Sequence, residues 1–403
     1  MNNTKPFTIN RTKRLLLSIA TTAAIALSVV SVPAEAGKSP PSIIAAPVSN
    51  SWSLPFADAQ FATVDLFGNM IAVANVGANV TVGKYDGSGA LMANWAFADS
   101  NFIVTVATDL TGNVVVASRG TVTSTTSTGL PVFSYTPELP VLAMAVDPSG
   151  NVVIAAGDWY TDLVIEKLSA TGVHSFTKTF SSTGGIEDFK LATDSAGNII
   201  VAAAYQDGAM NLGGASLTTP GMDSLIVAKL SSTGSHVFSK IFNSTTDTNG
   251  SSAGIYEVQL AVRANNEIVV TGTIDGAGKF AIGSKNITLP QTRMETMFVS
   301  KFSATGNTAF AKSVNIDGVH VQAVAIDNAS NIVVTGEDRE GNFLGVPGGI
   351  YMAKYAGGNG NLMSSDLVST GWTNTIAVNP LTNDIVMSGG EDSGTNFVMQ
   401  LLN

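Results

Sequence analysis

Seven side chains at one repeated position could form a chemical site, because they differ in type while the sequence around them recurs. Each stands seven residues before a recurring turn, and in chain order they are Asp58, Phe102, Pro140, Glu187, Tyr256, His320 and Trp372. Carboxylates, an imidazole and a phenol can exchange protons, and aromatic rings can stack on a sugar. If the fold gathers these positions, they would combine binding with acid and base chemistry.

Further acidic and aromatic residues lie in segments that we expect at the same end of the fold. They are Asp158, Trp159, Tyr160, Asp162, Asp207, Asp275, Glu337, Asp338, Glu391 and Asp392. An acidic surface with aromatic rings suits a cation, a basic protein or a sugar, although loop carboxylates can also be plain solvated surface. The sequence thus predicts a ligand-binding mouth formed by Asp58, Phe102, Glu187, Tyr256, His320, Trp372, Asp158, Trp159 and Tyr160.

Catalytic motifs are sparse in this chain. It has no Cys and three His, and two of these, His174 and His236, follow Thr-Gly at equivalent places of two repeats. No zinc-type spacing and no Gly-x-Gly-x-x-Gly loop occurs. These observations favour a binding or surface protein without catalytic machinery. The alternative is a secreted glycan lyase or hydrolase, with His320 or Tyr256 as base and Glu187 or Asp58 as acid.

The recurring turn defines the structural units that must position these residues. Its copies occupy residues 65–69, 109–113, 147–151, 194–198, 263–267, 327–331 and 379–383, and the first four read Asp-x-x-Gly-Asn. Each copy leads into a run of Val, Ile and Ala, and each repeat offers four short strand candidates. The clearest are 141–146, 152–156, 163–168 and 174–180. Seven copies of a four-stranded antiparallel unit predict an all-β, seven-bladed β-propeller.

The two ends of the repeat region complement each other. The last repeat stops at its third strand, 396–403, whereas residues 51–56 resemble a fourth strand such as 94–97. Pairing of these two segments would remove the open edge between the first and last blades. We therefore expect the last blade to be closed by an N-terminal strand at about 51–56.

The first residues have the pattern of an export signal. Lys5, Arg11, Lys13 and Arg14 precede an apolar run from 15 to 32, and Ala34-Glu35-Ala36 suits cleavage. We expect a signal peptide at 1–36, a Pro-containing linker at 37–50 and one propeller domain at 51–403. Such a protein would be periplasmic, extracellular or on the cell surface, with no membrane span after cleavage.

The invariant parts of the repeat call for structural roles. Asp and Asn of the turns are expected to close them through side-chain hydrogen bonds, with calcium binding as the weaker alternative and no other cofactor or metal. Lysines recur at one position of the third strand and should lay their apolar stems along the blade. They are Lys84, Lys167, Lys229, Lys301 and Lys354.

The repeat resembles the bacterial β-propeller repeat (SBBP type) of exported and cell-surface proteins. The match is best over 191–242, where Asn211-Leu-Gly-Gly-Ala precedes Leu225-Ile-Val-Ala-Lys229. The resemblance implies a propeller outside the cytoplasm and supplies no catalytic residues. We expect a monomer with a carbohydrate or protein ligand at the channel mouth. Nucleic acid is not an expected partner, because the chain carries a net charge of −10.

Overall fold

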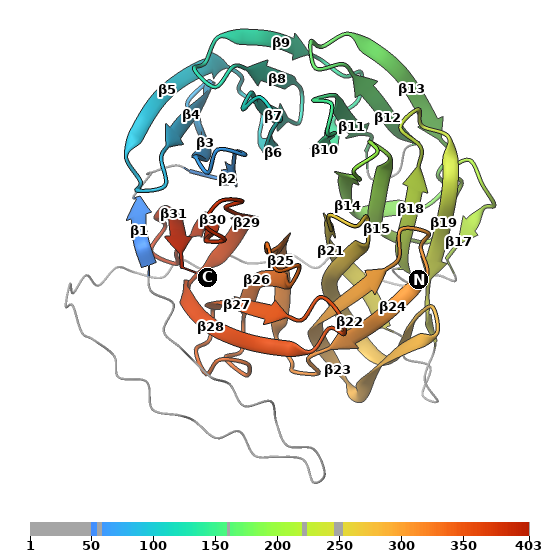
Figure 1. The fold of residues 1–403 in the computed structure, drawn as a ribbon. Helices are drawn as coiled ribbons and strands as arrows, with labels where there is room; N and C mark the ends of the chain where they lie inside the picture. The colour runs from blue at the N-terminus through green and yellow to red at the C-terminus, as the bar shows by residue number, and fades with distance from the viewer. Residues whose placement is uncertain (1–49, 55–58, 159–161, 220–223, 246–252, 403) are drawn as a thin grey trace, which may run out of the picture. The chain divides into compact units, whose positions relative to one another are not determined.

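The computed structural model describes residues 50–54, 59–158, 162–219, 224–245 and 253–402. The regular elements among them are all strands, which form seven antiparallel sheets arranged as blades around a central axis (Figure 1). The predicted seven-bladed β-propeller is therefore confirmed. The expected signal peptide and nearly all of the linker lie outside the described residues.

Each blade contains four strands that follow one another outward from the axis. Blade 1 consists of β2 (Phe61–Val64), β3 (Met70–Val76), β4 (Asn79–Tyr85) and β5 (Leu91–Ala98). Blade 2 consists of β6 (Ile103–Thr108), β7 (Val114–Ser118), β8 (Val122–Thr125) and β9 (Pro131–Tyr135). Blade 3 consists of β10 (Val141–Val146), β11 (Val152–Ala156), β12 (Leu163–Leu168) and β13 (His174–Phe180). Blade 4 consists of β14 (Gly185–Thr193), β15 (Ile199–Gln206), β18 (Ser224–Leu230) and β19 (His236–Phe242).

The later blades repeat this order. Blade 5 consists of β21 (Ala253–Val262), β22 (Ile268–Ile282), β23 (Lys285–Phe302) and β24 (Thr308–Ser313). Blade 6 consists of β25 (Val319–Ile326), β26 (Ile332–Asp338), β27 (Gly349–Tyr355) and β28 (Leu362–Thr370). Blade 7 consists of β29 (Trp372–Val378), β30 (Ile385–Gly390), β31 (Asn396–Leu401) and β1 (Asn50–Leu54).

The long repeats contain added strands. A small hairpin of β16 (Ala209–Met210) and β17 (Leu217–Thr218) stands between β15 and β18. In blade 5, β22 and β23 run on past Gly276 as an extended hairpin, on which β20 (Ser244–Thr245) pairs with β22. These additions explain why the turns at 194–198, 263–267 and 327–331 are spaced more widely than the earlier turns.

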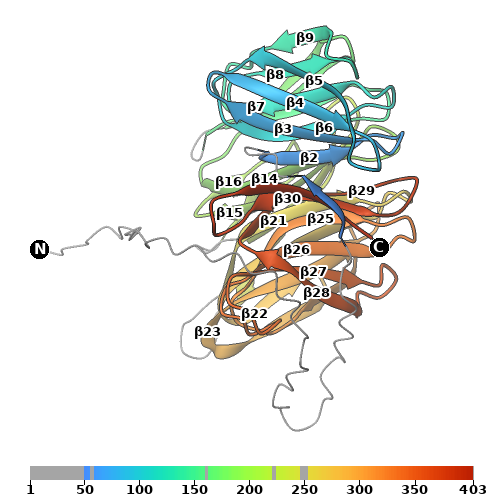
Figure 2. The same ribbon diagram turned by 90° about the vertical axis from the view of Figure 1, so that its left-hand side faces the viewer.

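The N-terminal strand closes the ring. Strand β1 pairs antiparallel with β31, with Ser53 opposite Met399 and Leu54 opposite Val398 (Figures 1 and 2). The structure thus confirms the predicted fourth strand of the last blade, observed at 50–54. Residues 55 and 56 of the predicted strand lie outside the described residues.

The hydrophobic core lies between neighbouring blades. Every residue of β15 from Ile199 to Tyr205 is buried, because the two faces of this strand pack against different blades. Val201 and Ala203 join a cluster with blade 3, whereas Ala202 and Ala204 join a cluster with blade 5. Second strands are consequently apolar on both faces, which explains the unbroken Val, Ile and Ala runs in the sequence.

The recurring turn is held by its first side chain. Asp194 Oδ1 accepts hydrogen bonds from the backbone N–H groups of Ala196 and Asn198, both at 2.9 Å, and Oδ2 accepts one from the Asn198 amide at 2.9 Å. The third-strand lysine, Lys229, places Nζ 2.6 Å from the same Oδ2. Equivalent ion pairs join Asp65 to Lys84, Asp147 to Lys167 and Asp327 to Lys354. The lysines therefore have a further role as partners of the turn, which the sequence did not indicate.

Candidate functional site

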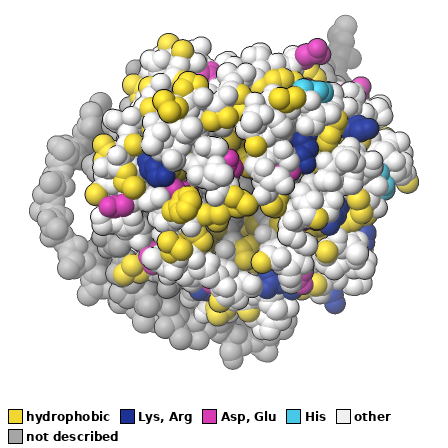
Figure 3. All heavy atoms as spheres, turned by 45° about the horizontal axis from the view of Figure 1, so that its top comes forward, with side chains coloured by type: hydrophobic (Ala, Val, Ile, Leu, Met, Phe, Trp, Pro, Cys, Tyr) yellow, Lys and Arg dark blue, Asp and Glu magenta, His cyan; other side chains and the backbone are white. Residues whose placement is uncertain are grey.

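The first strands of all seven blades begin at one end of the propeller, which we call the mouth. Because neighbouring strands are antiparallel, the second strands end and the third strands begin at this same end. A central channel cavity of about 290 Å³ is lined by residues of these first strands, among them Phe61, Thr105, Leu142, Lys190, Gln259, Gln322 and Asn374. Figure 3 shows one face of the molecule, hollowed near its centre with hydrophobic side chains gathered around the hollow.

The residues predicted to ring the mouth differ in their surroundings. Phe102 is 77% exposed, Trp372 is 39% exposed and Pro140 is also exposed. Tyr256 and His320 lie in contact, with ring centroids 5.9 Å apart. Asp158 is exposed and Glu187 is half-buried. Three predicted members, Asp58, Trp159 and Tyr160, lie outside the described residues.

A second cavity of about 190 Å³ opens among blades 2, 3 and 4. Its charged lining consists of Arg119, Asp158, Glu187 and Asp188. The rest of the wall is apolar and consists of Val104, Val141, Leu142, Ile186 and Phe189. We call this the mouth cavity; two of the predicted residues, Asp158 and Glu187, line it. Opposite charges over an apolar floor can orient a ligand that has both polar and apolar parts.

The carboxylates of the mouth cavity are positioned by neighbours. Glu187 accepts a hydrogen bond from the side-chain amide of Gln206, at the end of the adjacent strand β15. Asp188 forms an ion pair of 2.5 Å with Lys190, and its second oxygen accepts a hydrogen bond of 3.0 Å from the backbone N–H of Val258 in blade 5. Asp188 therefore ties two blades together, while Glu187 is held by a neutral side chain and keeps its charge available.

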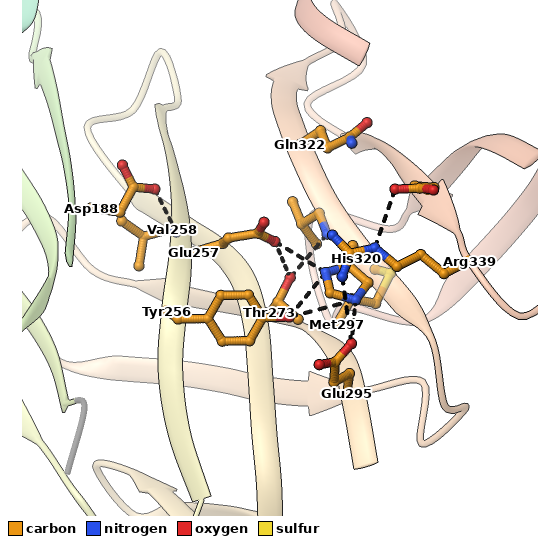
Figure 4. A network of polar contacts seen from close by, with 12 residues as sticks. Asp188, Tyr256, Glu257, Val258, Thr273, Glu295, Met297, His320, Gln322 and Arg339 are labelled. Carbon is orange, nitrogen blue, oxygen red and sulfur yellow. Dashed lines mark hydrogen bonds and ion pairs between the residues drawn. The ribbon is translucent and has the colours of Figure 1, made fainter. Parts of the chain in front are cut away.

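His320 is the centre of a polar network between blades 5 and 6 (Figure 4). Its side chain is fully buried, with Nε2 2.8 Å from Glu295 Oε2 and Nδ1 3.0 Å from the Tyr256 hydroxyl. Because a carboxylate only accepts, Nε2 donates to Glu295, while Nδ1 shares a hydrogen bond with the Tyr256 hydroxyl. The hydroxyl of Tyr351 donates to the backbone carbonyl of His320 at 2.7 Å. Glu257 Oε2 completes the shell, 3.5 Å from Nδ1.

Two neighbours of His320 have shifted acidities. Burial would raise the pKa of Glu257, but hydrogen bonds with His320 and Thr273 outweigh burial and hold its pKa below the usual value. Burial, reinforced by the negative charges of Glu257 and Glu295, raises the pKa of the Tyr256 phenol well above its ordinary value. Tyr256 thus stays protonated as a hydrogen-bond donor, which is the opposite of what a general base requires.

The enzyme alternative needed His320 or Tyr256 beside Glu187 or Asp58. The structure places Glu187 in the mouth cavity with Arg119. It places His320 and Tyr256 in the network of blades 5 and 6, where the contacting carboxylates are Glu295 and Glu257. The predicted residues therefore fall into two groups rather than one.

Sequence reasoning missed Arg119, Gln206, Glu257 and Glu295. Glu295 reaches His320 because blade 5 carries the extended β22–β23 hairpin, whose register no spacing in the sequence reveals. Arg119 stands in the connection after β7, outside every recurring motif. A scan for the few basic residues in this acidic chain would have singled it out.

In the ranges that the structure describes, no group of three or more His, Cys, Asp or Glu side chains could hold a metal ion. The turn carboxylates, on which a calcium role would depend, accept hydrogen bonds from backbone N–H groups and Asn amides. No helix long and apolar enough to span a membrane occurs among the described residues.

Comparisons with known proteins support the fold. No protein-family model and no curated protein matches the chain. The β-propeller domain of Cps50 (Swd1) from Myceliophteria thermophila is similar in structure, with a TM-score of 0.57 at 10% identity, covering 89% of this chain and 100% of that one. A chain of the mitotic checkpoint complex gives 0.54 at 11% identity, covering 94% and 99%. BamB from Moraxella catarrhalis gives 0.52 at 14% identity, covering 88% and 100%. This chain is a β-propeller.

Proposed function

We propose that this chain is an exported β-propeller that binds a protein or carbohydrate ligand at its mouth without transforming it. The observation that carries the proposal is the mouth cavity, where Arg119, Asp158 and Glu187 surround an apolar floor. These residues differ from one repeat to the next. In a repeat scaffold, unlike residues on one face are the natural place for a specific ligand.

The charges of the mouth cavity favour a peptide segment as ligand. The carboxylates of Asp158 and Glu187 suit an ammonium or guanidinium group, and Arg119 suits a carboxylate. Leu142, Ile186 and Phe189 can receive an apolar side chain between these charges. A similar structure comes from the mitotic checkpoint complex, a multi-protein assembly, which shows that the scaffold is used for assembly elsewhere. A sugar is the second candidate, because exposed Phe102 and Trp372 offer rings for stacking.

Catalysis by the predicted acid and base is the weaker hypothesis. It would require the fully buried His320 to exchange protons with a ligand, although both ring nitrogens already have partners. The raised pKa of Tyr256 also disfavours its use as a base. We assign His320 a structural role in which it holds Glu295 and Tyr256 at the mouth.

Export is part of the proposal and rests on the sequence of residues 1–36. A basic start, an apolar run and Ala34-Glu35-Ala36 suit a cleaved signal peptide. Cell fractionation of the tagged protein, with N-terminal sequencing, tests this directly. A cytoplasmic protein that retains residue 1 would contradict export.

The ligand hypothesis is tested with a peptide array and a glycan array probed by the purified protein. Hits are then measured by calorimetry with Glu187→Gln and Arg119→Met, using Lys178→Met on the exposed outer strand β13 as matched control. We expect the two mouth variants to weaken binding by about tenfold, which corresponds to about 1.4 kcal/mol. Hits that release shortened or unsaturated products would support the enzyme alternative instead.

A further inference from the structure

A second surface lies at the end of the propeller opposite the mouth. The recurring turns between first and second strands are found there, and in three adjacent blades they carry large apolar side chains that are 47% to 68% exposed. We call this surface the apolar turn patch; it consists of Leu66 and Phe67 in blade 1, Leu110 in blade 2 and Leu381 in blade 7. The same turn positions in the other four blades read Pro148-Ser149, Ser195-Ala196, Ala264-Asn265 and Asn328-Ala329. Turn closure does not need apolar side chains, so these residues require another explanation.

The patch is continuous across its three blades. A Cβ atom at Gly68 would lie 3.1 Å from Leu381 Cδ1, and one at Gly112 would lie 3.3 Å from Phe67 Cε2. Leu381 and Phe67 therefore each lie over the glycine of the next turn. Polar contacts also join neighbouring turns, such as the 3.2 Å hydrogen bond from Asn379 Nδ2 to Gly68 O and the 3.0 Å bond from Ser195 N to Asn266 Oδ1. A contiguous exposed apolar surface of this kind marks an interaction site.

The charges around the patch are negative. Residues 59–135 and 372–402, which form blades 7, 1 and 2 apart from β1, contain two basic residues, Lys84 and Arg119. Lys84 is neutralised by Asp65, with a separation of 2.9 Å, and Arg119 lines the mouth cavity at the other end. Blades 2 and 7 have Ser124 and Gln400 at the lysine position of the third strand. The carboxylates left without a basic partner among the described residues at this end of the three blades are Asp86, Asp109 and Asp384.

We propose that the apolar turn patch docks a segment of a protein partner whose apolar side chains are flanked by lysine or arginine. The apolar side chains would cover Phe67 and Leu381, and the basic ones would meet Asp86 and Asp384. A second copy of this chain is a poor occupant because it presents the same negative charges. An anionic lipid surface is disfavoured for the same reason. This site lies opposite the mouth and does not depend on the proposed function.

The test measures binding of short fluorescein-labelled peptides by anisotropy. The probe alternates Leu and Lys, and two comparison peptides replace Leu by Ser or Lys by Glu. The proteins are wild type, the double variant Phe67→Ser with Leu381→Ser, the double variant Asp86→Asn with Asp384→Asn, and Val237→Ser as control. Val237 is an equally exposed apolar residue, 52%, on the outer strand of blade 4. Thermal unfolding of each variant establishes that it is folded.

We expect the Leu/Lys peptide to bind wild type and Val237→Ser equally. Both double variants should bind it about tenfold more weakly, and both comparison peptides should bind wild type about tenfold more weakly. The proposal would be overturned if the Phe67→Ser, Leu381→Ser variant bound the Leu/Lys peptide as tightly as wild type does. It would also be overturned if wild type bound the Ser/Lys peptide as tightly as the Leu/Lys peptide. Sedimentation showing a dimer of wild type that dissociates in that variant would overturn it too, because a second copy would then be the occupant.

Discussion

Lys301 Nζ lies 3.0 Å from Glu267 Oε1, although in four other blades the equivalent lysine meets the first residue of the turn. In blade 5 that first residue is Arg263, which pairs with the same Glu267. The carboxylate has moved from the start of the turn to its end, and the lysine has kept a partner. Blade 5 thus keeps the ion pair with a different carboxylate, whereas blades 2 and 7 have Ser124 and Gln400 in place of the lysine.

The third-strand lysine should be important for stability. In Lys229→Met, Asp194 loses its ion-pair partner although its side chain is only 1% exposed. Removal of one partner of a buried pair costs about 3–5 kcal/mol, because the remaining charge is buried without compensation. Urea unfolding of Lys229→Met and of Lys178→Met, whose lysine is exposed, measures the difference. Equal stability of the two variants would show that the ion pair is dispensable.

The turn carboxylates should make the protein sensitive to acid. Burial would raise the pKa of Asp194, but hydrogen bonds from Lys229, Asn198 and the backbone outweigh it and leave the pKa below 3.8; Asp147 and Asp327 behave alike. A pKa depressed by folding gives stability that is complete above the unfolded value and is lost as the pH falls through the folded value. We expect unfolding free energy to be level near pH 7 and to drop below about pH 4.

The variant Asp194→Asn tests whether Asp194 contributes to this loss of stability at low pH. It should be less stable than wild type at pH 7, and it should lose less stability than wild type between about pH 5 and pH 2. If both proteins lost the same stability at low pH, carboxylates other than Asp194 would be responsible.

Glycines of positive φ in the turns between third and fourth strands should not tolerate a larger residue. Gly172 has a φ of +81°, and an added Cβ would lie 2.5 Å from Cβ and Cγ of Phe133 in the preceding blade. The left-handed backbone alone costs an alanine about 1–2 kcal/mol, and the overlap adds to this. Gly172→Ala should therefore lower Tm clearly. Gly87→Ala is the matched control, because its Cβ would meet no atom within 4 Å; a similar fall in both variants would contradict the packing argument.

We expect His320 to contribute to the stability of the fold rather than to ligand binding. Its imidazole is fully buried and is bonded on both ring nitrogens. His320→Ala leaves Tyr256 and Glu295 without this partner and opens a cavity, so we expect a loss of at least about 2 kcal/mol. Tyr256→Phe removes one hydrogen bond and should cost less. A His320→Ala protein with unchanged stability and abolished turnover of a glycan would instead support the enzyme alternative.

The repeat made the fold readable from the sequence. The turn at 194–198 and the run of Val, Ile and Ala that follows it both recur along the chain, so one pattern predicted seven blades. The missing fourth strand also followed from counting, and β1 fills that place opposite Met399.

The site was harder to predict from the sequence because its residues differ from one repeat to the next. Tyr256 and His320 lie in contact, and the carboxylate partner of His320, Glu295, comes from an extended hairpin whose register only the structure gives. Arg119 and Glu187 line one cavity because of how the blades are arranged around the ring. Their spacing in the sequence does not predict this. The ion pairs between the third-strand lysines and the turn aspartates were not predicted, because each recurring residue was interpreted by itself.

Binding at the mouth cavity can be tested by one titration. The strongest hit from the peptide and glycan arrays is titrated into wild type, Glu187→Gln and Lys178→Met by calorimetry. We expect Glu187→Gln to raise Kd about tenfold and Lys178→Met to leave it unchanged. An unchanged Kd in Glu187→Gln, with the protein folded, would contradict a ligand site at Glu187.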